Sequence, residues 1–306
     1  MDGSDITNGG YLSMSLYRPF ERERNRLDVS SKFMPKTMVY LVPYVLISTF
    51  QYQVAQDGLK YSSPFLLMGL RYLIAALILF AVVRSFKPIL NKDTVLLSLM
   101  TCASTGFWIL GLEYVSTSES AVLSYTMPLI SIPMAYIVLS EKASHREWAG
   151  AAIGFLGVLV YSFVVLETRT LSALGAVLTL MNAFFWAMYT IYYRKLRDQE
   201  PTMTVATQLL FGAFVFLLLT PVGFRVNLTP VFWFDVGYLS VFSAAASFLL
   251  WNAISRLQRV GKTSTLIYTT PLTVTAVQYV ETSVLPPPIS LIGMGLMIFG
   301  IYIARF

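Results

Sequence analysis

Charged residues are scarce in this sequence of 306 residues, where Asp, Glu, Lys and Arg together make up 12% and hydrophobic residues 56%. A soluble domain carries roughly twice that share of charged residues. The apolar residues fall into runs of about 20, which is long enough for a helix to cross the hydrocarbon core of a bilayer. These runs are too long and too uniformly apolar for the alternating strands of a membrane β-barrel. The composition therefore predicts an all-α polytopic membrane protein.

Cysteine and histidine are nearly absent, with one residue of each, Cys102 and His145. A single cysteine excludes a disulfide within the chain, and two such residues cannot form a Cys/His metal cluster. No predicted span contains paired carboxylates, whereas an enzyme needs convergent acid, base or metal groups. The rings of charge or filter loop of a channel are also missing. We therefore expect neither an enzyme nor a channel, and no cofactor.

Ten helical spans are predicted, separated by short loops in which proline marks several boundaries. Their approximate ranges are 36–56, 64–84, 93–113, 119–140, 147–166, 171–192, 202–221, 231–254, 262–281 and 288–305. The polar stretch 1–35 holds no apolar core of a cleavable signal peptide, and we expect a cytosolic N-terminal tail there. The alternative is an interfacial segment whose Leu16, Tyr17 and Phe20 enter the headgroup region.

Lys and Arg in the loops predict the orientation, because cytosolic loops are enriched in these residues. With the N-terminus inside, the cytosolic loops hold Arg84, Lys87, Lys92, Lys142, Arg146, Arg194, Lys195, Arg197, Arg256, Arg259 and Lys262. The opposite loops hold only Lys60, Arg169 and Arg225. We therefore expect both termini in the cytosol, in a plasma or inner membrane. The same distribution explains the positive net charge without a nucleic-acid partner.

The two halves of the chain repeat each other. At an offset of 143 residues, Tyr125 and Pro128 align with Tyr268 and Pro271. The same offset pairs Trp108 with Trp251, Ser104 with Ser247, Gly150 with Gly293 and Gly157 with Gly300. Five spans in each half make corresponding helices point in opposite directions, as in the inverted repeats of secondary transporters. We predict a first five-helix repeat over 36–166, a second over 171–306, and transport by alternating access between them.

Several short patterns resemble the drug/metabolite transporter superfamily, of the EamA type. The second helix of an EamA repeat typically carries a proline, then an arginine, then small residues, as Pro64, Arg71 and Ala75–Ala76 do here. Its fourth helix typically has a small residue, a proline near the middle and an acidic residue at the cytosolic end. Ser120, Pro128 and Glu141 follow that order.

Spaced glycines are typical of the fifth helix of this family, and Gly150, Gly154 and Gly157 match them. The second half departs from the family pattern, since Gln208 replaces the arginine and Val284 stands opposite Glu141. The resemblance covers residues 36–306 and implies a transporter with ten transmembrane helices in a 5+5 inverted repeat.

The predicted substrate site combines residues that recur in both halves with polar residues inside spans. It consists of Gln51, Tyr52, Arg71, Trp108, Tyr125, Pro128, Asn182, Trp186, Tyr189, Trp251, Asn252, Tyr268 and Pro271. Prolines kink helices, and buried phenols and amides need hydrogen-bond partners, which a central cavity supplies. The alternatives are kinks that only shape packing, aromatic residues of the membrane interface, and hydrogen bonds between helices.

Arg71 is the one full charge well inside a predicted span, about 10 Å from its outer end by helical rise. A charge exposed to lipid is costly, so the side chain needs partners. The candidates are Asp57, Glu113, Glu119 and helix carbonyls. An ion pair that fixes helix packing is one interpretation, and binding of a substrate carboxylate is the other.

Together these features predict a secondary-type transporter, an exporter or a facilitator, that works in the lipid bilayer as a monomer or homodimer. Its expected substrates are small polar metabolites, with amino acids or related amines as the leading class. The related phosphate and nucleotide-sugar carriers usually place Lys or Arg in the second half of the cavity, and mid-depth charges are missing there. Small multidrug-resistance proteins couple to protons through a Glu in their first helix, where this chain has Gln51 and Gln53. The alternative function is export of hydrophobic drugs or aromatic compounds.

Overall fold

The computed structural model describes residues 34–167, 172–283, 285 and 287–306. Most of the predicted N-terminal tail, with Leu16, Tyr17 and Phe20, therefore lies outside the described residues, as does Arg169. The chain divides into two units, Met1–Val39 and Tyr40–Phe306. The candidate site belongs to the second unit.

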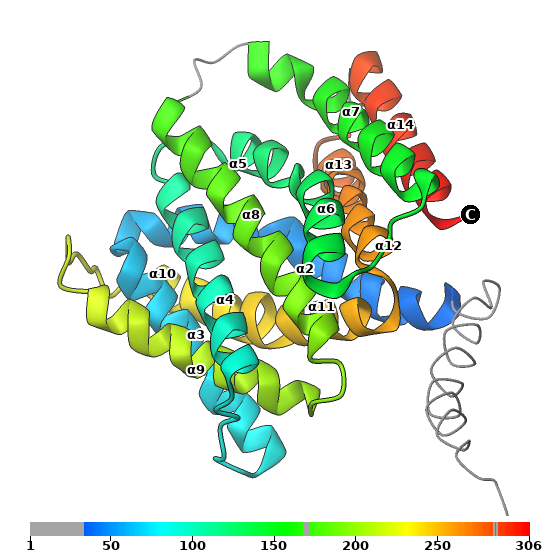
Figure 1. Cartoon of the computed structure of the whole chain (residues 1–306). Coiled ribbons are helices and arrows are strands. Elements are labelled where there is room, and N and C mark those ends of the chain that lie inside the picture. Colours follow the sequence, from blue (N-terminus) through cyan, green and yellow to red (C-terminus); the bar gives the residue numbers. More distant parts are fainter. Residues whose placement is uncertain (1–33, 168–171, 284, 286) are drawn as a thin grey trace, which may run out of the picture. The chain divides into compact units, whose positions relative to one another are not determined.

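Helices lie at each of the predicted spans (Figure 1). They are α2 (Met34–Tyr61), α3 (Pro64–Val83), α4 (Lys92–Gly111), α5 (Thr117–Ser124), α6 (Met127–Leu139), α7 (His145–Glu167), α8 (Ala173–Lys195), α9 (Pro201–Leu219), α10 (Pro230–Tyr238), the π-helix η1 (Leu239–Ala246), α11 (Ser247–Leu257), α12 (Val260–Ser264), the 3₁₀-helix η2 (Thr265–Tyr268), α13 (Thr269–Thr282) and α14 (Pro288–Arg305). The described residues form no strand beyond an isolated bridge between Ser62 and Val226.

Seven of the described helical segments are long and apolar enough to cross a membrane. They are Pro64–Val83, Lys92–Gly111, Thr117–Leu139, Ala173–Lys195, Pro201–Leu219, Pro230–Leu257 and Pro288–Arg305. This confirms an all-α polytopic membrane protein. The full set of ten spans and its inverted arrangement stay predictions.

The two repeated prolines coincide with changes in helix geometry. Pro128 has no N–H to donate to the carbonyl of Ser124, and the span divides between α5 and α6 at Tyr125 and Thr126. In the second half, the 3₁₀-helix η2 ends at Tyr268, just before Pro271 in α13. Helix geometry therefore changes within three residues before each proline, at Tyr125 and Thr126 in the first half and between Tyr268 and Thr269 in the second.

Helices α7 and α14 pack closely along a line of glycines. A Cβ atom on Gly150 would lie 2.5 Å from the carbonyl oxygen of Gly300, and one on Gly157 would lie 2.7 Å from that of Gly293. Such approaches to backbone leave no space for any side chain. The spaced glycines thus form a packing surface within the chain.

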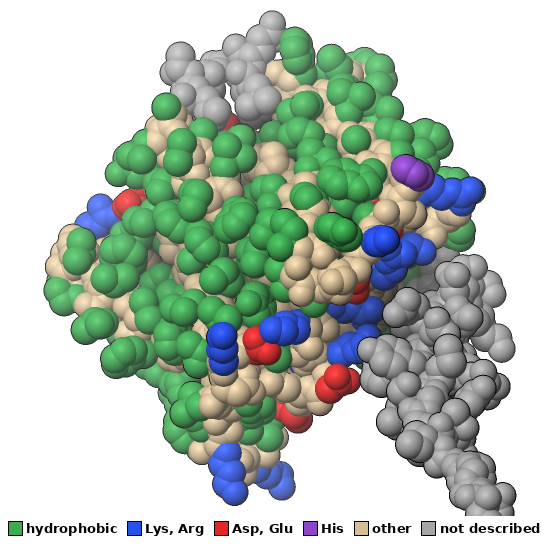
Figure 2. Space-filling model, in the orientation of Figure 1, with side chains coloured by type: hydrophobic (Ala, Val, Ile, Leu, Met, Phe, Trp, Pro, Cys, Tyr) green, Lys and Arg blue, Asp and Glu red, His purple; other side chains and the backbone are tan. Residues whose placement is uncertain are grey.

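Further helix pairs unite the two halves: α3 packs along α9, and α4 packs along α8 (Figure 1). Large apolar side chains on the outer surfaces of these helices are exposed, among them Val82, Phe214 and Leu218. Figure 2 shows apolar side chains covering much of the visible face, with most Lys and Arg in its lower and right-hand parts. In a bilayer, that apolar surface is the one suited to contact with lipid.

Candidate functional site

A central cavity lies among helices α2, α3, α4, α8, η1 and α11. It is lined by Tyr44, Gln51, Tyr52, Arg71, Ser104, Thr105, Trp108, Asn182, Trp186, Tyr189, Ser243, Ser247, Phe248 and Trp251. The cavity has a volume of about 50 Å³. This is well below the volume of typical small-molecule sites, about 300–1,000 Å³. The site is narrow in this conformation, so a bulky ligand requires movement of the walls.

Arg71 enters this cavity from α3 and is only 3% exposed. Its Nη2 atom donates to the carbonyl oxygen of Ser243 at 2.9 Å and to the hydroxyl of the same residue at 3.0 Å. The Ser243 hydroxyl in turn donates to Oε1 of Gln51 at 2.9 Å. The guanidinium also lies 5.4 Å from the ring centroid of Trp108. Neutral groups on α2, η1 and α4 therefore surround this cation.

The three carboxylates that the sequence offers as partners of Arg71 are occupied elsewhere or exposed. Asp57 pairs with Lys60, at 2.6 Å between Oδ1 and Nζ. Glu119 caps the start of α5, accepting a bond from the Ser116 backbone N–H at 2.7 Å, and Glu113 is exposed. The ion pairs found among the described residues do not include Arg71.

Ser243, the partner of Arg71, lies on the π-helix η1. An α-helix that widens to π geometry changes the direction in which its side chains and carbonyls point, and such segments often occur at functional sites. In this chain η1 and the first turn of α11 supply Ser243, Ser247 and Phe248 to the cavity.

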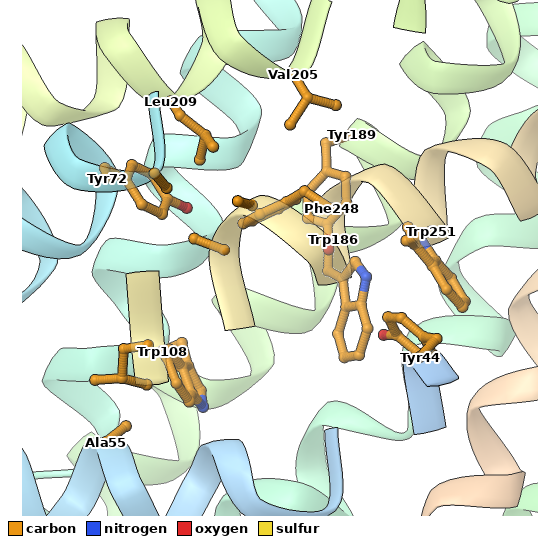
Figure 3. Packing of buried hydrophobic residues seen from close by; sticks show 14 of the residues in the cluster. Tyr44, Ala55, Tyr72, Trp108, Trp186, Tyr189, Val205, Leu209, Phe248 and Trp251 are labelled. Atoms are coloured by element: carbon orange, nitrogen blue, oxygen red, sulfur yellow. The ribbon is translucent and has the colours of Figure 1, made fainter. Parts of the chain in front are cut away.

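Aromatic rings form the other side of the cavity (Figure 3). The ring centroids of Tyr44 and Trp251 are 4.9 Å apart, and those of Trp186 and Trp251 are 6.0 Å apart. In Figure 3 these three rings gather together, with Trp108 on the opposite side. Trp251 is fixed by a hydrogen bond from Nε1 to the Thr190 hydroxyl, at 2.9 Å. The cavity thus has a cationic side and an aromatic side.

Asn182 fits both interpretations that the sequence allows for polar residues inside a span. Its Oδ1 atom accepts from Ser104 at 2.9 Å, and its Nδ2 atom donates to Ser124 at 3.0 Å. These bonds join α8 to α4 and α5, yet the side chain also lines the cavity. Asn182 therefore links helices at the cavity wall.

Eight predicted site residues line this one cavity: Gln51, Tyr52, Arg71, Trp108, Asn182, Trp186, Tyr189 and Trp251. The structure places the other predicted residues outside its lining: Tyr125, Pro128, Asn252, Tyr268 and Pro271. The Tyr268 hydroxyl donates to the carbonyl of Ala151 at 2.9 Å, and its ring lies against Gly154. Asn252 accepts from the Nε atom of Arg256. Both side chains are engaged in packing near the cavity rather than in its wall.

Sequence reasoning did not select six lining residues: Tyr44, Ser104, Thr105, Ser243, Ser247 and Phe248. Hydroxyl residues are common in apolar helices, where they bond to the preceding turn, so each one is a weak signal alone. The internal repeat does mark one pair, because Ser104 aligns with Ser247 and both line the cavity. Among the described side chains, no group of three or more His, Cys, Asp or Glu residues could hold a metal ion.

Known proteins similar to this chain are named as transporters. The model of the EamA-like transporter family matches residues 36–163 and again residues 173–306. An "Uncharacterized transporter in sor 3'region" from Acidianus ambivalens is 44% identical over 78% of this chain and 92% of that protein. A "Probable amino-acid metabolite efflux pump" from Salmonella typhimurium is 25% identical over 86% of this chain and 92% of its own length.

A shorter match, 26% identical over 53% of both chains, is the "S-adenosylmethionine uptake transporter" of Rickettsia prowazekii. One solved crystal structure superposes with a TM-score of 0.74 at 18% identity, covering 88% of this chain and 96% of the other. At that identity the likeness shows the fold alone. The two family matches and the long similar sequence show more: this chain belongs to the EamA-like transporter family and is a polytopic membrane transporter.

Proposed function

We propose that this protein is a secondary-type transporter, an exporter or facilitator, that moves small polar metabolites across the membrane by alternating access. Amino acids or related amines are the proposed class. The observation that carries the proposal is that both family-matched segments build the cavity. Helices α2, α3 and α4 come from the first segment, and α8, η1 and α11 come from the second.

The inverted repeat gives this arrangement its mechanism. Two five-helix repeats, 36–166 and 171–306, that face opposite ways supply two nearly equivalent packings, each open to one side. A hinge in each repeat lies beside Pro128 and Pro271; the break between α5 and α6 and the change from 3₁₀ to α geometry between η2 and α13 support this assignment. The amino-acid efflux pump named among the similar proteins supports the proposed class.

A second candidate function is export of hydrophobic drugs or aromatic compounds, which the rings of Tyr44, Trp186 and Trp251 favour. Uptake and counterflow in proteoliposomes, with a panel of amino acids, amines, sugar phosphates and aromatic drugs, separates the two. Trp186→Ala in the cavity should reduce flux, whereas Phe214→Ala on the exposed outer surface should not. No protein-dependent flux of any compound in the panel would contradict the proposal.

A further inference from the structure

We infer that the ligand of the central cavity is an organic acid, and that its carboxylate pairs with Arg71. This inference rests on the proposed transport function and narrows its substrate class. It is carried by the charge and hydrogen-bonding capacity of the cavity wall. Among the lining residues that the structure describes, Arg71 alone carries a charge.

Arg71 is a buried charge without a carboxylate partner, and such a charge is costly. A guanidinium carries five N–H donors, and a buried cation without a counter-charge is strongly disfavoured. Ser243 satisfies one nitrogen of Arg71, and the Sδ atom of Met68, a weak acceptor, lies 3.4 Å from another. The Nε atom is buried and has no partner. The rings of Tyr72 and Trp108 lie 5.5 Å and 5.4 Å from the guanidinium, but no described carboxylate pairs with it and its Nε donor is free.

Other polar groups at the cavity wall that lack hydrogen-bond partners are donors too. The indole Nε1 atoms of Trp108 and Trp186 are buried and have no hydrogen-bond partner. A ligand that binds here gains most if it brings acceptors and negative charge. A simple amine brings a cation to a wall whose only charge is positive.

The charge of the cavity wall distinguishes a carboxylate from a phosphate. Arg71 is a lone guanidinium among neutral groups, so it balances the single charge of a carboxylate but not both charges of a phosphate dianion. A guanidinium can form two parallel hydrogen bonds with the carboxylate. The body of the ligand then faces the rings of Tyr44, Trp186 and Trp251 across the cavity (Figure 3). An acid with an apolar or aromatic body fits these two sides.

The test uses the purified, full-length protein and compares matched probes by thermal shift and by proteoliposome counterflow. The probes are phenylalanine and leucine, their carboxamides, phenethylamine and isoamylamine, phenylpyruvate and 4-methyl-2-oxopentanoate, and glycerol 3-phosphate. We expect stabilisation by acids, with their amides, amines and the phosphate weaker by roughly 30-fold or more. Equal binding of amides, amines or phosphate, or no binding of any acid, would overturn the inference.

Two substitutions separate ligand binding from a structural role of Arg71. Arg71→Gln should melt at the same or a higher temperature without ligand, because it removes an unbalanced buried charge, and it should lose the acid-dependent shift. Arg71→Lys should retain part of that shift. If Arg71→Gln melts lower and binds acids normally, the arginine serves packing and the inference is wrong.

The same experiments distinguish a failure of the carboxylate assignment from a failure of the proposed transport function. Flux of amines or amides that persists in Arg71→Gln would retain a transporter and overturn the carboxylate assignment. Acid binding that depends on Arg71, without flux of any acid, would overturn the proposed transport while retaining the assignment.

Discussion

Arg194 and Glu141 form an ion pair that joins the ends of α8 and α6, with 3.1 Å between Nε and Oε1. Arg194 also donates from Nη1 to the carbonyl of Arg256 at 2.7 Å, and Glu141 accepts from the backbone N–H of Val260 at 3.1 Å. Glu141, in the family-matched segment 36–163, thus contacts two residues of the segment 173–306, Arg194 and Val260. On the predicted topology, this ion pair lies on the cytosolic side of the membrane.

Replacing Glu141 should loosen the cytosolic end. The pair is mostly shielded from solvent, so Glu141→Gln should favour opening there by about 1 kcal/mol, roughly a fivefold change in population. The measurement is the maleimide labelling rate of Ser255→Cys, a buried position on α11, in a Cys102→Ser background. We expect labelling to become about five times faster.

The matched control for Glu141→Gln is Asp93→Asn. Asp93 pairs with Lys195 at 2.7 Å on the surface, joining α4 and α8, and both side chains are about a third exposed. Removing this exposed pair should leave the labelling rate of Ser255→Cys unchanged. Equal acceleration by both substitutions would mean that the Glu141 pair has no special place in closing the cavity.

The helical fold could be predicted from the sequence because its physical causes are local. Apolar runs of membrane length, prolines at their boundaries and the Lys/Arg clusters are each visible without tertiary contacts. Arg71 was also predictable as a site residue, since a charge inside an apolar run needs a reason. Its partner Ser243 was not, because Ser243 lies on a π-helix, whose geometry no sequence period reveals.

Symmetry was the weaker guide to the site. Trp108 and Trp251 recur at the repeat offset and both line the cavity. Tyr125 and Tyr268 recur at the same offset, yet Tyr268 lies on Gly154, where the missing side chain leaves space for its ring. Recurrence at the repeat offset therefore does not by itself place a residue in the cavity wall.

Gly300→Ala should destabilise the protein through the α7–α14 contact. Its new Cβ atom would lie 2.5 Å from the backbone nitrogen of Gly154, so the two helices would have to separate. Overpacking of this kind costs about 1–3 kcal/mol. Gly295→Ala is the control on the same helix, because a Cβ atom there has open space. Thermal unfolding should show a lower melting temperature only for Gly300→Ala, and equal melting temperatures would refute the close contact.

Tyr268→Phe and Tyr52→Phe should have opposite effects. Tyr268 donates to the carbonyl of Ala151 at 2.9 Å outside the cavity lining, so its hydroxyl should contribute about 0.5–1.5 kcal/mol to the free energy of unfolding and little to binding. Tyr52 lines the cavity, with its ring edge on Trp108, and losing its hydroxyl should weaken binding instead. Melting curves and ligand titrations on both variants check this division. Weaker binding by Tyr268→Phe at unchanged stability would reverse it.

The predicted orientation can be checked at the two ends of α3. Lys60 lies just before this helix and Leu90 beyond it, and both side chains are exposed. In a Cys102→Ser background, Lys60→Cys should react with a membrane-impermeant maleimide added outside intact cells. Leu90→Cys should react only after the cells are permeabilised. Labelling of Leu90→Cys in intact cells would invert the topology.

Transport should proceed without an imposed proton gradient, because none of the lining residues that the structure describes is acidic.

Asp235, in α10, is the residue that challenges this expectation. It is 3% exposed, and its Oδ2 atom has no hydrogen-bond partner. Asp235→Asn keeps the shape of the side chain and removes the titration, so flux that does not depend on protons should survive it. Counterflow at equal pH, measured for the parent protein and for Asp235→Asn, tests whether flux depends on protons. Flux that requires a pH difference in the parent protein and loses that requirement in Asp235→Asn would identify Asp235 as the coupling carboxyl, outside the cavity that holds Arg71.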